Sequence, residues 1–344
     1  MTDVRVLMFG AHPDDCEFES SGLAALVTRA GGVVRFVSAT DGSSGHHEMT
    51  GPELVERRRA EARAGAAAVG ATVTNLGFTD GWLFPDRALR EAVITAIRSF
   101  GPHVVVSPRP SDYHPDHRAI ATAVQDAGYL LMVPGIVPEA PVPETRPVIL
   151  HTHDPFTDPR PFRPDVVFDI DAVLERKLDA IMAHESQVRE WLPHINGFAA
   201  EVPDGEPART EFLRRREREK INRIAVKFAD ELKRRHGRVP SAAEAYEISE
   251  YGAPADAGRV HELLGILPGC GALNLRAVEV QVGTRRGGAP LALVAGTVLL
   301  RAVRVPGLGG EPEETQLTDL HARPQFHGQR GHVRQFQGHV PGET

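Results

Sequence analysis

Two short segments of this chain combine the side chain types that bind and activate a catalytic metal. Residues 12–15 read His-Pro-Asp-Asp and directly follow an apolar run at residues 4–9. Residues 114–117 read His-Pro-Asp-His and come after a second apolar run at residues 103–106. Open α/β sheets bind ligands beyond the carboxyl ends of their strands. The sequence therefore predicts that both segments meet at one edge of a sheet and form a single metal site.

The residue types in these segments divide into metal ligands and a base. A catalytic zinc ion takes three protein ligands from His, Asp, Glu or Cys and keeps a further position for water. His12, Asp15 and His117 can supply that set. Asp14 is adjacent to a ligand, but successive residues of an extended segment point opposite ways. We therefore expect Asp14 to accept the proton of an activated water molecule.

His114 and Asp116 remain for other tasks in the second segment. A spacing of three residues brings the imidazoles of His114 and His117 to one side of a first helical turn. Amide hydrolysis develops negative charge on the carbonyl oxygen and needs a proton for the leaving amine, and a protonated His114 could serve both needs. The alternative donor of that proton is the newly protonated Asp14. Asp116 could hold that imidazole charged. The alternative is that Asp116 caps or charges the start of a helix.

Short apolar runs alternate with helical patterns along the part of the chain that must position these segments. This alternation predicts right-handed βαβ units, and hence a Rossmann-like, mostly parallel α/β sheet flanked by helices. A densely charged helix at residues 209–235 predicts a C-terminal helical extension. The expected strands cover residues 4–9, 33–38, 72–76, 103–106, 148–151 and 166–170, and the expected helices cover residues 21–30, 53–69, 87–100, 118–125 and 173–184.

The composition is that of an ordinary globular protein, with 344 residues, of which 41% are hydrophobic and 25% charged. A net charge of −7 argues against sequence-independent binding to nucleic acid or to an anionic membrane. Cys16 and Cys270 are too few for a disulfide framework and suit a reducing interior; we expect Cys16 to pack as a small apolar residue. Without a signal peptide or a spanning segment, the sequence predicts a cytoplasmic protein that acts on a small molecule.

With these residues identified, the chain resembles the PIG-L or LmbE-like zinc deacetylase family over residues 3–195. The resemblance implies removal of an N-acetyl or other N-acyl group from an amino sugar or glycoconjugate related to N-acetylglucosamine. It implies one zinc ion per chain, or another divalent metal, bound by His12, Asp15 and His117. It also implies Asp14 as the general base and His114 as the group that stabilises the oxyanion.

The same resemblance implies residues that bind the substrate. Arg58 and Asp80 match positions that contact sugar hydroxyls in relatives, and their structural alternatives are a helix-surface salt bridge and a turn. Tyr113 is a candidate oxyanion donor, although a catalytic tyrosine in some relatives lies one residue further upstream. Relatives often assemble into homo-oligomers, but the sequence does not define an oligomeric state.

The expected domain organisation follows from the extent of this resemblance. We expect an LmbE-like α/β core at residues 1–200 and a helical extension packed on it at residues 201–267. Residues 268–344 are rich in Gly, Pro, Gln and His, which predicts a partly disordered C-terminal extension.

Two other functions are compatible with the same residues. A metal-dependent phosphoesterase would prefer a second metal and more carboxylate or Arg around it, whereas the sequence offers one full ligand set. A zinc-containing sugar-binding protein without turnover would need only the ligands. The presence of Asp14 and His114 favours an enzyme.

Overall fold

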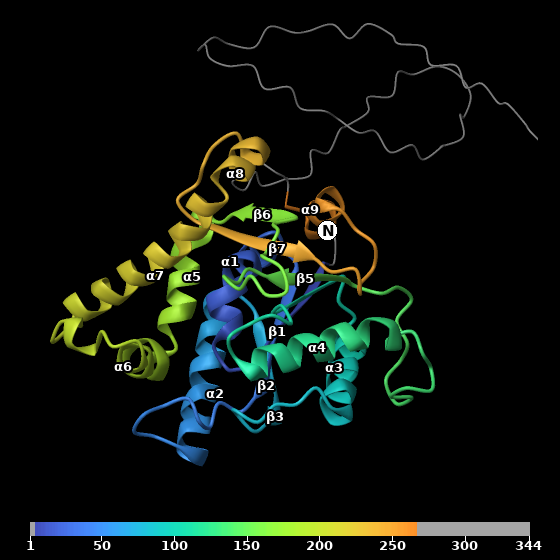
Figure 1. Cartoon of the computed structure of the whole chain (residues 1–344), viewed down its shortest axis with the longest axis horizontal. Coiled ribbons are helices and arrows are strands. Elements are labelled where there is room, and N and C mark those ends of the chain that lie inside the picture. Colours follow the sequence, from blue (N-terminus) through green and yellow to red (C-terminus); the bar gives the residue numbers. More distant parts are fainter. Residues whose placement is uncertain (1–3, 267–344) are drawn as a thin grey trace, which may run out of the picture. The chain divides into compact units, whose positions relative to one another are not determined.

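The computed structural model describes residues 4–266, and at its centre lies a seven-stranded sheet with the order β3-β2-β1-β4-β5-β7-β6 (Figure 1). β1 to β5 run parallel, and β7 pairs antiparallel with both β5 and β6. The predicted Rossmann-like, mostly parallel sheet is therefore confirmed. The strands are β1 (Arg5–Gly10), β2 (Val33–Thr40), β3 (Thr72–Phe78), β4 (Val104–Ser107), β5 (Val148–Thr152), β6 (Val166–Asp169) and β7 (Ala243–Ile248). The disorder predicted for residues 268–344 concerns residues outside the described part.

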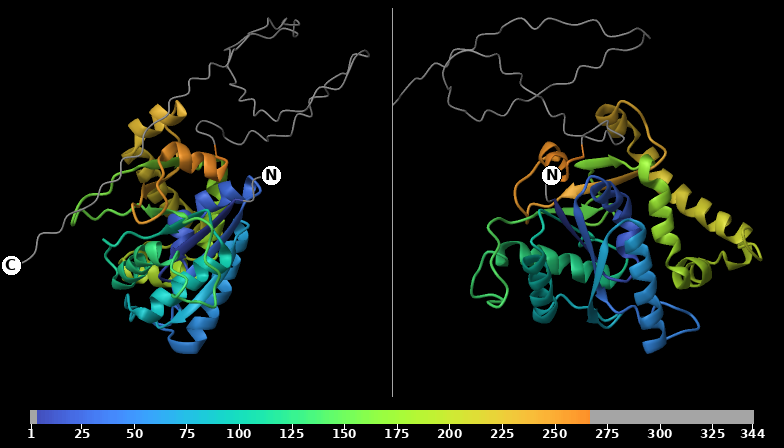
Figure 2. Two further views of the ribbon diagram at one scale, coloured as in Figure 1. Left: turned by 90° about the vertical axis from the view of Figure 1, so that its right-hand side faces the viewer. Right: turned by 180° about the vertical axis from the view of Figure 1, so that it is seen from behind.

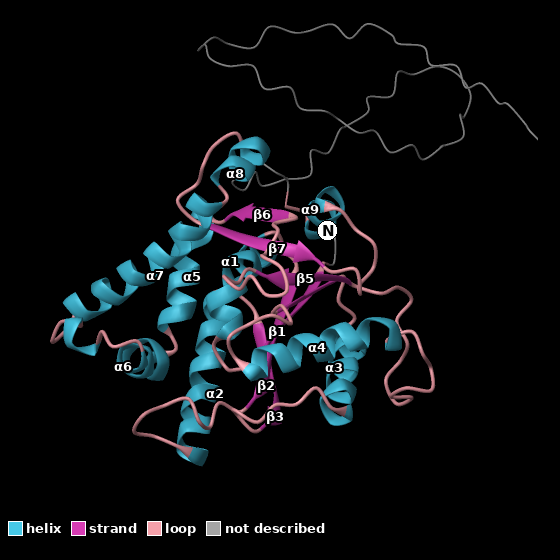
Figure 3. Cartoon of the chain, viewed as in Figure 1, coloured by secondary structure: helices cyan, strands magenta, loops and turns pink. Residues whose placement is uncertain are grey.

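Helices cover both faces of this sheet (Figures 2 and 3). α1, α2 and α5 pack on one face around Val6 and Met8, whereas α3 and α4 pack on the other around Leu7 and Phe9. Alternate residues of a strand point to opposite faces, so a parallel strand covered on both sides is apolar throughout. The helices are α1 (Asp15–Arg29), α2 (Gly51–Ala68), α3 (Arg87–Phe100), α4 (Pro115–Leu130), α5 (Leu174–Met182), α6 (Leu192–Ile195), α7 (Ala208–Lys227), α8 (Ala229–His236) and α9 (Ala257–Leu264), with short helical turns η1 (Asp171–Val173), η2 (Ser186–Trp191) and η3 (Ala199–Glu201).

The C-terminal extension is helical, as predicted, but it also contributes β7 to the sheet. β7 is rich in Ala and Glu, which are depleted in strands, so its local sequence gives little strand signal. Its Glu244 is buried and accepts hydrogen bonds from the backbone N–H groups of Gly22 and Leu23 and from Lys177. Tertiary contacts with α1 and α5 thus offset a weak strand propensity.

The charged segment after residue 207 forms two helices instead of one. α7 ends at Lys227 and α8 begins at Ala229, with Phe228 between them. The apolar side chains of Leu213, Ile221 and Ala225 are buried, as their spacing requires for a surface helix. None of the helices in residues 4–266 combines the length and apolar character that a membrane span requires.

His151 of β5 is a buried histidine with a structural role. Its Nδ1–H donates a hydrogen bond to the carbonyl of Pro108 at 2.8 Å, and its Nε2 lies 3.2 Å from the side chain amide of Gln125. Burial lowers the pKa of His151 to about 4. Between that value and its ordinary value of about 6.5, the unfolded chain binds a proton that the folded chain does not. The stability contributed by neutral His151 is therefore present above about pH 6.5 and is lost as the pH falls toward 4.

We expect the free energy of unfolding to fall by up to about 3 kcal/mol through this one group over that pH range. Replacement of His151 by Gln should flatten this part of the pH dependence, since glutamine does not titrate. Urea denaturation of both proteins at a series of pH values measures the difference. An unchanged slope in the variant would show that other groups govern the pH dependence.

Candidate metal centre

The predicted site residues gather where the order of the parallel strands reverses. The chain proceeds outward from β1 to β2 and β3 on one side, and from β4 to β5 on the other. Ligands of open α/β sheets bind at such a switch point, in the crevice beyond the carboxyl ends of the strands. The loop after β1 carries residues 12–15, and the loop after β4 leads to residues 112–117 at the start of α4. The structure therefore brings the two histidine-carboxylate segments together.

His12, Asp15 and His117 point their donor atoms at one another. His12 Nδ1 lies 3.2 Å from His117 Nε2 and 3.4 Å from Asp15 Oδ2, and His117 Nε2 lies 3.3 Å from Asp15 Oδ1. A tetrahedral zinc ion with bonds of about 2.0–2.2 Å separates its ligand atoms by about 3.3–3.6 Å. Two histidines 105 residues apart in sequence are thus brought together, and each faces a different oxygen of Asp15, so these three side chains form a donor set of candidate ligands for such an ion.

Further carboxylates contact the other ring nitrogens of His12 and His117 and orient both imidazoles. His12 Nε2 lies 3.2 Å from Asp80 Oδ1 and 3.4 Å from Asp116 Oδ2. His117 Nδ1 lies 2.9 Å from Asp112 Oδ1. Histidines that bind metals commonly donate their other ring N–H to a carboxylate, which fixes the tautomer and raises the basicity of the ligating nitrogen. His12 Nδ1 and His117 Nε2 therefore face each other. The donor atoms of His12, Asp80 and Asp116, and those of His12, His114 and His117, also lie close enough to one another to hold a metal ion.

The pKa values show that the cluster favours positive charge. Burial opposes charge on His117, but the carboxylates of Asp15 and Asp112 outweigh it and raise its pKa to about 10. The same balance between burial and Asp15 raises the pKa of His12 well above its ordinary value. Burial opposes ionisation of Asp15, yet His117 and His12 hold its pKa well below the usual range. A cluster that attracts protons to its imidazoles in this way also attracts a divalent cation.

Asp116 occupies a different place from the one predicted. Its carboxylate contacts His12 and accepts the backbone N–H groups of Gly81 at 2.7 Å and Leu83 at 3.1 Å, so it cannot also turn toward His114. Burial opposes ionisation of Asp116, but His12 and these two N–H groups lower its pKa. Asp116 does not cap α4, whose N-cap is His114, but it does place a negative charge in the first turn of that helix, as the alternative expected.

His114 lies beside the donor set in a form suited to hydrogen-bond donation. Its Nδ1 accepts the backbone N–H of Asp116 at 3.2 Å, so in the neutral ring the hydrogen is on Nε2. Its ring centroid is 4.5 Å from that of His12 and 5.1 Å from that of His117. Burial and the positive charges of these two neighbours lower the pKa of His114. The environment therefore favours the neutral ring over the protonated form that we expected from the sequence.

Asp14 and Arg58 form a buried ion pair next to the donor set. The Arg58 Nη2–H group donates to Asp14 Oδ1 at 2.9 Å, and the Arg58 side chain is 2% exposed. Arg58 therefore does not form the surface salt bridge of the structural alternative.

Asp80, which was predicted together with Arg58 as a sugar contact, is also buried. Burial opposes ionisation of Asp80, but the hydrogen bond from His12 lowers its pKa to about 2. Tyr113 is 69% exposed, with its ring centroid 5.4 Å from that of His117.

Two residues of the site escaped the sequence analysis. Asp112, which orients His117, stands five residues before it and resembles any other loop aspartate. Gly10 ends β1, and a Cβ atom there would lie 2.6 Å from the Cβ of Asp15. The glycine at the end of the first strand is the one indication in the sequence that Asp15 packs closely against this position. Cys16 is buried and its thiol donates to the carbonyl of Met8, which agrees with the expected packing role.

We expect replacement of Asp112 by Ala to weaken metal binding by about 10–100-fold, because His117 loses its orienting carboxylate. Calorimetric titration with zinc measures the affinity. Asp126→Ala is the matched control, since Asp126 forms a half-exposed ion pair with Arg90 on α3. Equal zinc affinity in the Asp112 variant and the control would contradict a role for Asp112 in the site.

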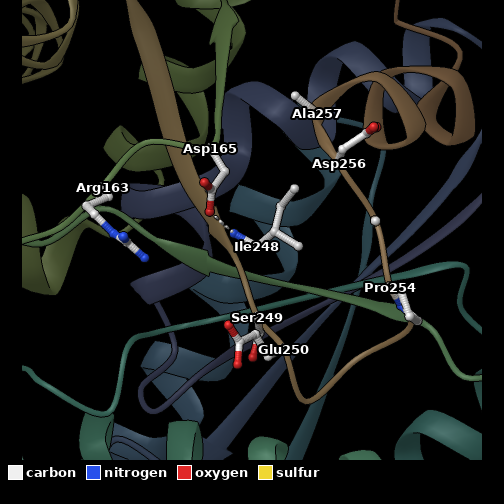
Figure 4. Close-up of a pocket in the computed structure, with 9 residues that line it drawn as sticks. Arg163, Asp165, Ile248, Ser249, Glu250, Pro254, Asp256 and Ala257 are labelled. Atoms are coloured by element: carbon white, nitrogen blue, oxygen red, sulfur yellow. Dashed lines mark hydrogen bonds between the residues drawn. The ribbon is translucent and has the colours of Figure 1, made fainter.

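A separate pocket of about 540 Å³ lies near the ends of β6 and β7 (Figure 4). Two of its three acidic side chains bind the local backbone: Asp165 accepts a hydrogen bond from the N–H of Ile248, and Asp256 caps α9 by accepting one from the N–H of Arg259. None of the predicted site residues lines it. Its lining residues are Arg163, Asp165, Ile248, Ser249, Glu250, Pro254, Ala255, Asp256 and Ala257.

A Rossmann-like sheet here carries imidazoles and carboxylates at its switch point, an arrangement that could hold a metal ion. Residues 7–128 match the family described as PIG-L: GlcNAc-PI de-N-acetylase. The chain is 33% identical over 214 residues to diacetylchitobiose deacetylase of Thermococcus kodakarensis, covering 57% of this chain and 76% of that relative. The chain therefore belongs to the PIG-L family, which confirms the family and the N-deacetylase class expected from the sequence.

Two further comparisons found a similar sequence and a similar structure. The chain is 27% identical over 197 residues to 4-oxalmesaconate hydratase of Pseudomonas putida, covering 54% of this chain and 74% of that relative. The structure of N,N'-diacetylchitobiose deacetylase from Pyrococcus horikoshii, complexed with its inhibitor MPG, superposes with a TM-score of 0.56. That pair is 24% identical and covers 72% of this chain and 84% of the other, so it shows a shared fold.

Proposed function

We propose that this protein is a zinc-dependent hydrolase that removes an N-acetyl or other N-acyl group from an amino-sugar-like substrate. The observation that carries the proposal is the donor set of His12, Asp15 and His117, with Asp14 and His114 beside it. Membership of the PIG-L family supports the reaction type. The deacetylase of Thermococcus kodakarensis supports an N-acetylated amino sugar as the substrate class.

Each residue of the site has a separate role in the proposed reaction. When bound, a zinc ion supplies a Lewis acid that polarises the amide carbonyl and makes water more acidic. Asp14, held by Arg58, accepts a proton from the attacking water. The Nε2–H of neutral His114 donates a hydrogen bond to the oxyanion of the tetrahedral intermediate. Protonated Asp14 then gives its proton to the departing amine as the C–N bond breaks, which restores the carboxylate. We propose that exposed Tyr113 contacts the substrate or the oxyanion.

The charges around the donor set favour a neutral substrate and a cationic amine product. Carboxylates dominate the surroundings, and the buried guanidinium of Arg58 is already paired with Asp14. An anionic phosphate ester would meet these carboxylates without a free cation among the residues named here. This arrangement disfavours the phosphoesterase alternative. The carboxylates are those of Asp14, Asp15, Asp80, Asp112 and Asp116.

A second candidate is addition of water to an unsaturated carboxylate, because the chain is also similar to 4-oxalmesaconate hydratase. The same base and metal could activate water for either reaction. The ring of carboxylates around the donor set favours the amide over an anionic substrate.

Metal analysis combined with a substrate panel tests the proposal. The panel contains N-acetylglucosamine, its disaccharide and other N-acylated amino sugars, with a phosphate monoester and 4-oxalmesaconate as the competing substrates. We expect about one zinc ion per chain and metal-dependent release of primary amine. Bound zinc without amine release from any amino sugar would contradict the proposal, and loss of 4-oxalmesaconate would instead establish the hydratase. Bound zinc without turnover of any substrate would support a sugar-binding protein.

A further inference from the structure

A buried polar cluster that the proposed reaction does not use lies behind Asp14 and Arg58. Glu17 of α1 and His184, which precedes η2, are 2% and 0% exposed. His184 Nε2 lies 3.3 Å from Glu17 Oε1. The charges of Glu17, Asp14 and Arg58 all act on the His184 ring. The His184 ring therefore interacts electrostatically with both members of the ion pair between Arg58 and Asp14, the proposed base.

Several polar atoms of this cluster lack a hydrogen bond of good geometry, although Glu17 Oε1 and His184 Nε2 face each other as an ion pair at 3.3 Å. Within residues 4–266, seven buried side chain nitrogen or oxygen atoms lack such a hydrogen bond, and four of the seven belong to three neighbouring residues. They are Glu17 Oε1, Arg58 Nε and both ring nitrogens of His184. Burying a polar atom without a hydrogen bond destabilises the fold, whereas apolar side chains of similar shape would avoid that cost. Stability alone does not account for such a group of residues at this place.

α2 leaves room for the pair at Gly65. Arg58, Glu61 and Gly65 recur at helical spacing and share one face of α2, which packs against α5. A Cβ atom at position 65 would lie 2.9 Å from both Glu17 Oε1 and His184 Nε2. Glycine inside a helix is unfavourable relative to alanine. A side chain at position 65 would also lie 3.0 Å from the carbonyl oxygen of Ala180 on α5. The sequence thus keeps a helix-weakening residue where both the pair and the backbone of α5 come close to α2.

The backbone next to His184 is fixed to the same helix. Glu61 accepts hydrogen bonds from the backbone N–H of Ser186 at 2.8 Å and from its hydroxyl at 2.5 Å. The His184 N–H in turn donates to the carbonyl of Ile181 at the end of α5. His184 is therefore held on both sides, between α5 and α2, and cannot follow Arg58 if the guanidinium moves.

We propose that Glu17 and His184 are positioning residues that fix the guanidinium of Arg58 and, through it, the carboxylate of Asp14. Arg58 has its own contact with the base, the 2.9 Å hydrogen bond to Asp14 Oδ1. The charge of Arg58 acts on the ring of His184, and Arg58 lies on the same face of α2 as Gly65, where the pair packs, so we expect the pair to limit the orientations of the guanidinium. This role rests on the proposed function of Asp14, but its structural consequence does not.

Kinetics of single and double variants test the proposal. We expect His184→Asn and Glu17→Gln each to lower kcat by about 10–100-fold, since a base displaced by about 1 Å loses activity on that scale, while KM and zinc content stay within about twofold. In the Arg58→Lys background the further effect of His184→Asn should fall below about twofold, because both changes disturb the same contact. Effects that multiply in the double variant, or a single variant with full kcat, would overturn the proposal.

His261→Asn is the matched control. His261 of α9 is also buried and has an unpartnered ring nitrogen, but it contacts the carbonyl of Ile266 and none of the site residues. We expect this variant to keep its kcat. A loss equal to that of His184→Asn would show that a buried histidine acts only through general stability.

A crystal structure separates this inference from the proposed function. In Gly65→Ala, the added Cβ atom displaces the Glu17–His184 pair, and we expect the Asp14 Oδ1 to Arg58 Nη2 distance to lengthen beyond 2.9 Å. This readout needs no substrate, and it also serves if His184→Asn does not fold. An unchanged ion pair next to a displaced His184 would overturn the inference. An inactive wild-type protein with a displaced ion pair in the variant would contradict the proposed function alone.

Discussion

Replacement of Asp14 by Asn lowers kcat for amide hydrolysis by about 10²–10⁴-fold, the usual contribution of a general base, and leaves zinc bound. The amide of asparagine cannot accept the proton of the attacking water. It keeps the size of the carboxyl group and its oxygen can still accept from Arg58. Asp14 is outside the donor set, which consists of His12, Asp15 and His117. Steady-state kinetics and metal analysis on the same preparation measure both parts of the result.

Two controls make this result specific to the base. Asp126→Asn removes a carboxylate from a half-exposed ion pair with Arg90, and it should leave kcat unchanged. Asp15→Asn changes a ligand and should lower zinc content together with kcat. If Asp14→Asn kept full activity, or lost its zinc, Asp14 would not be the base. A protein that binds sugar and zinc without turnover would show no amide hydrolysis in the wild-type protein or in any of these variants.

Replacement of His117 by Ala has the second large effect, which is loss of both stoichiometric zinc and its stabilisation of the fold. A metal that binds only the folded chain stabilises it by about 2.7 kcal/mol when its free concentration is 100 times Kd. For a domain of this size, that corresponds to an increase in Tm of about 5–10 °C. We expect the wild-type protein to lose this increase when a chelator is added. The variant should melt at the same temperature with and without zinc.

His194→Ala is the control for His117→Ala. His194 is exposed at α6, where its ring stacks on His47 instead of facing the donor set. This variant should keep the zinc-dependent Tm of the wild-type protein. A zinc-dependent Tm in the His117 variant would place the metal elsewhere in the chain.

The sequence alone determined the layers of the fold and the ligand types of the site. The central strands β1, β4 and β5 were predicted because each is a short apolar run, and a parallel strand covered on both faces must be apolar along its whole length. The edge strand β3 is more polar and was predicted from its extended pattern after a helix. The histidines and carboxylates of residues 12–15 and 114–117 were found for a related reason. Each segment follows a strand that ends at the ligand-binding edge, so chain order alone places both there.

Only the tertiary structure decided which carboxylate supports which imidazole. Asp116 is two residues from His114, yet the N–H groups of Gly81 and Leu83 hold its carboxylate toward His12. Arg58 turns inward because α2 packs on α5 and brings it to Asp14. Such contacts join loops that are far apart in the chain. The spacing of residues within a segment determines which face of a helix or strand each side chain occupies. The side chain that it contacts depends on which other segments the sheet places next to that face.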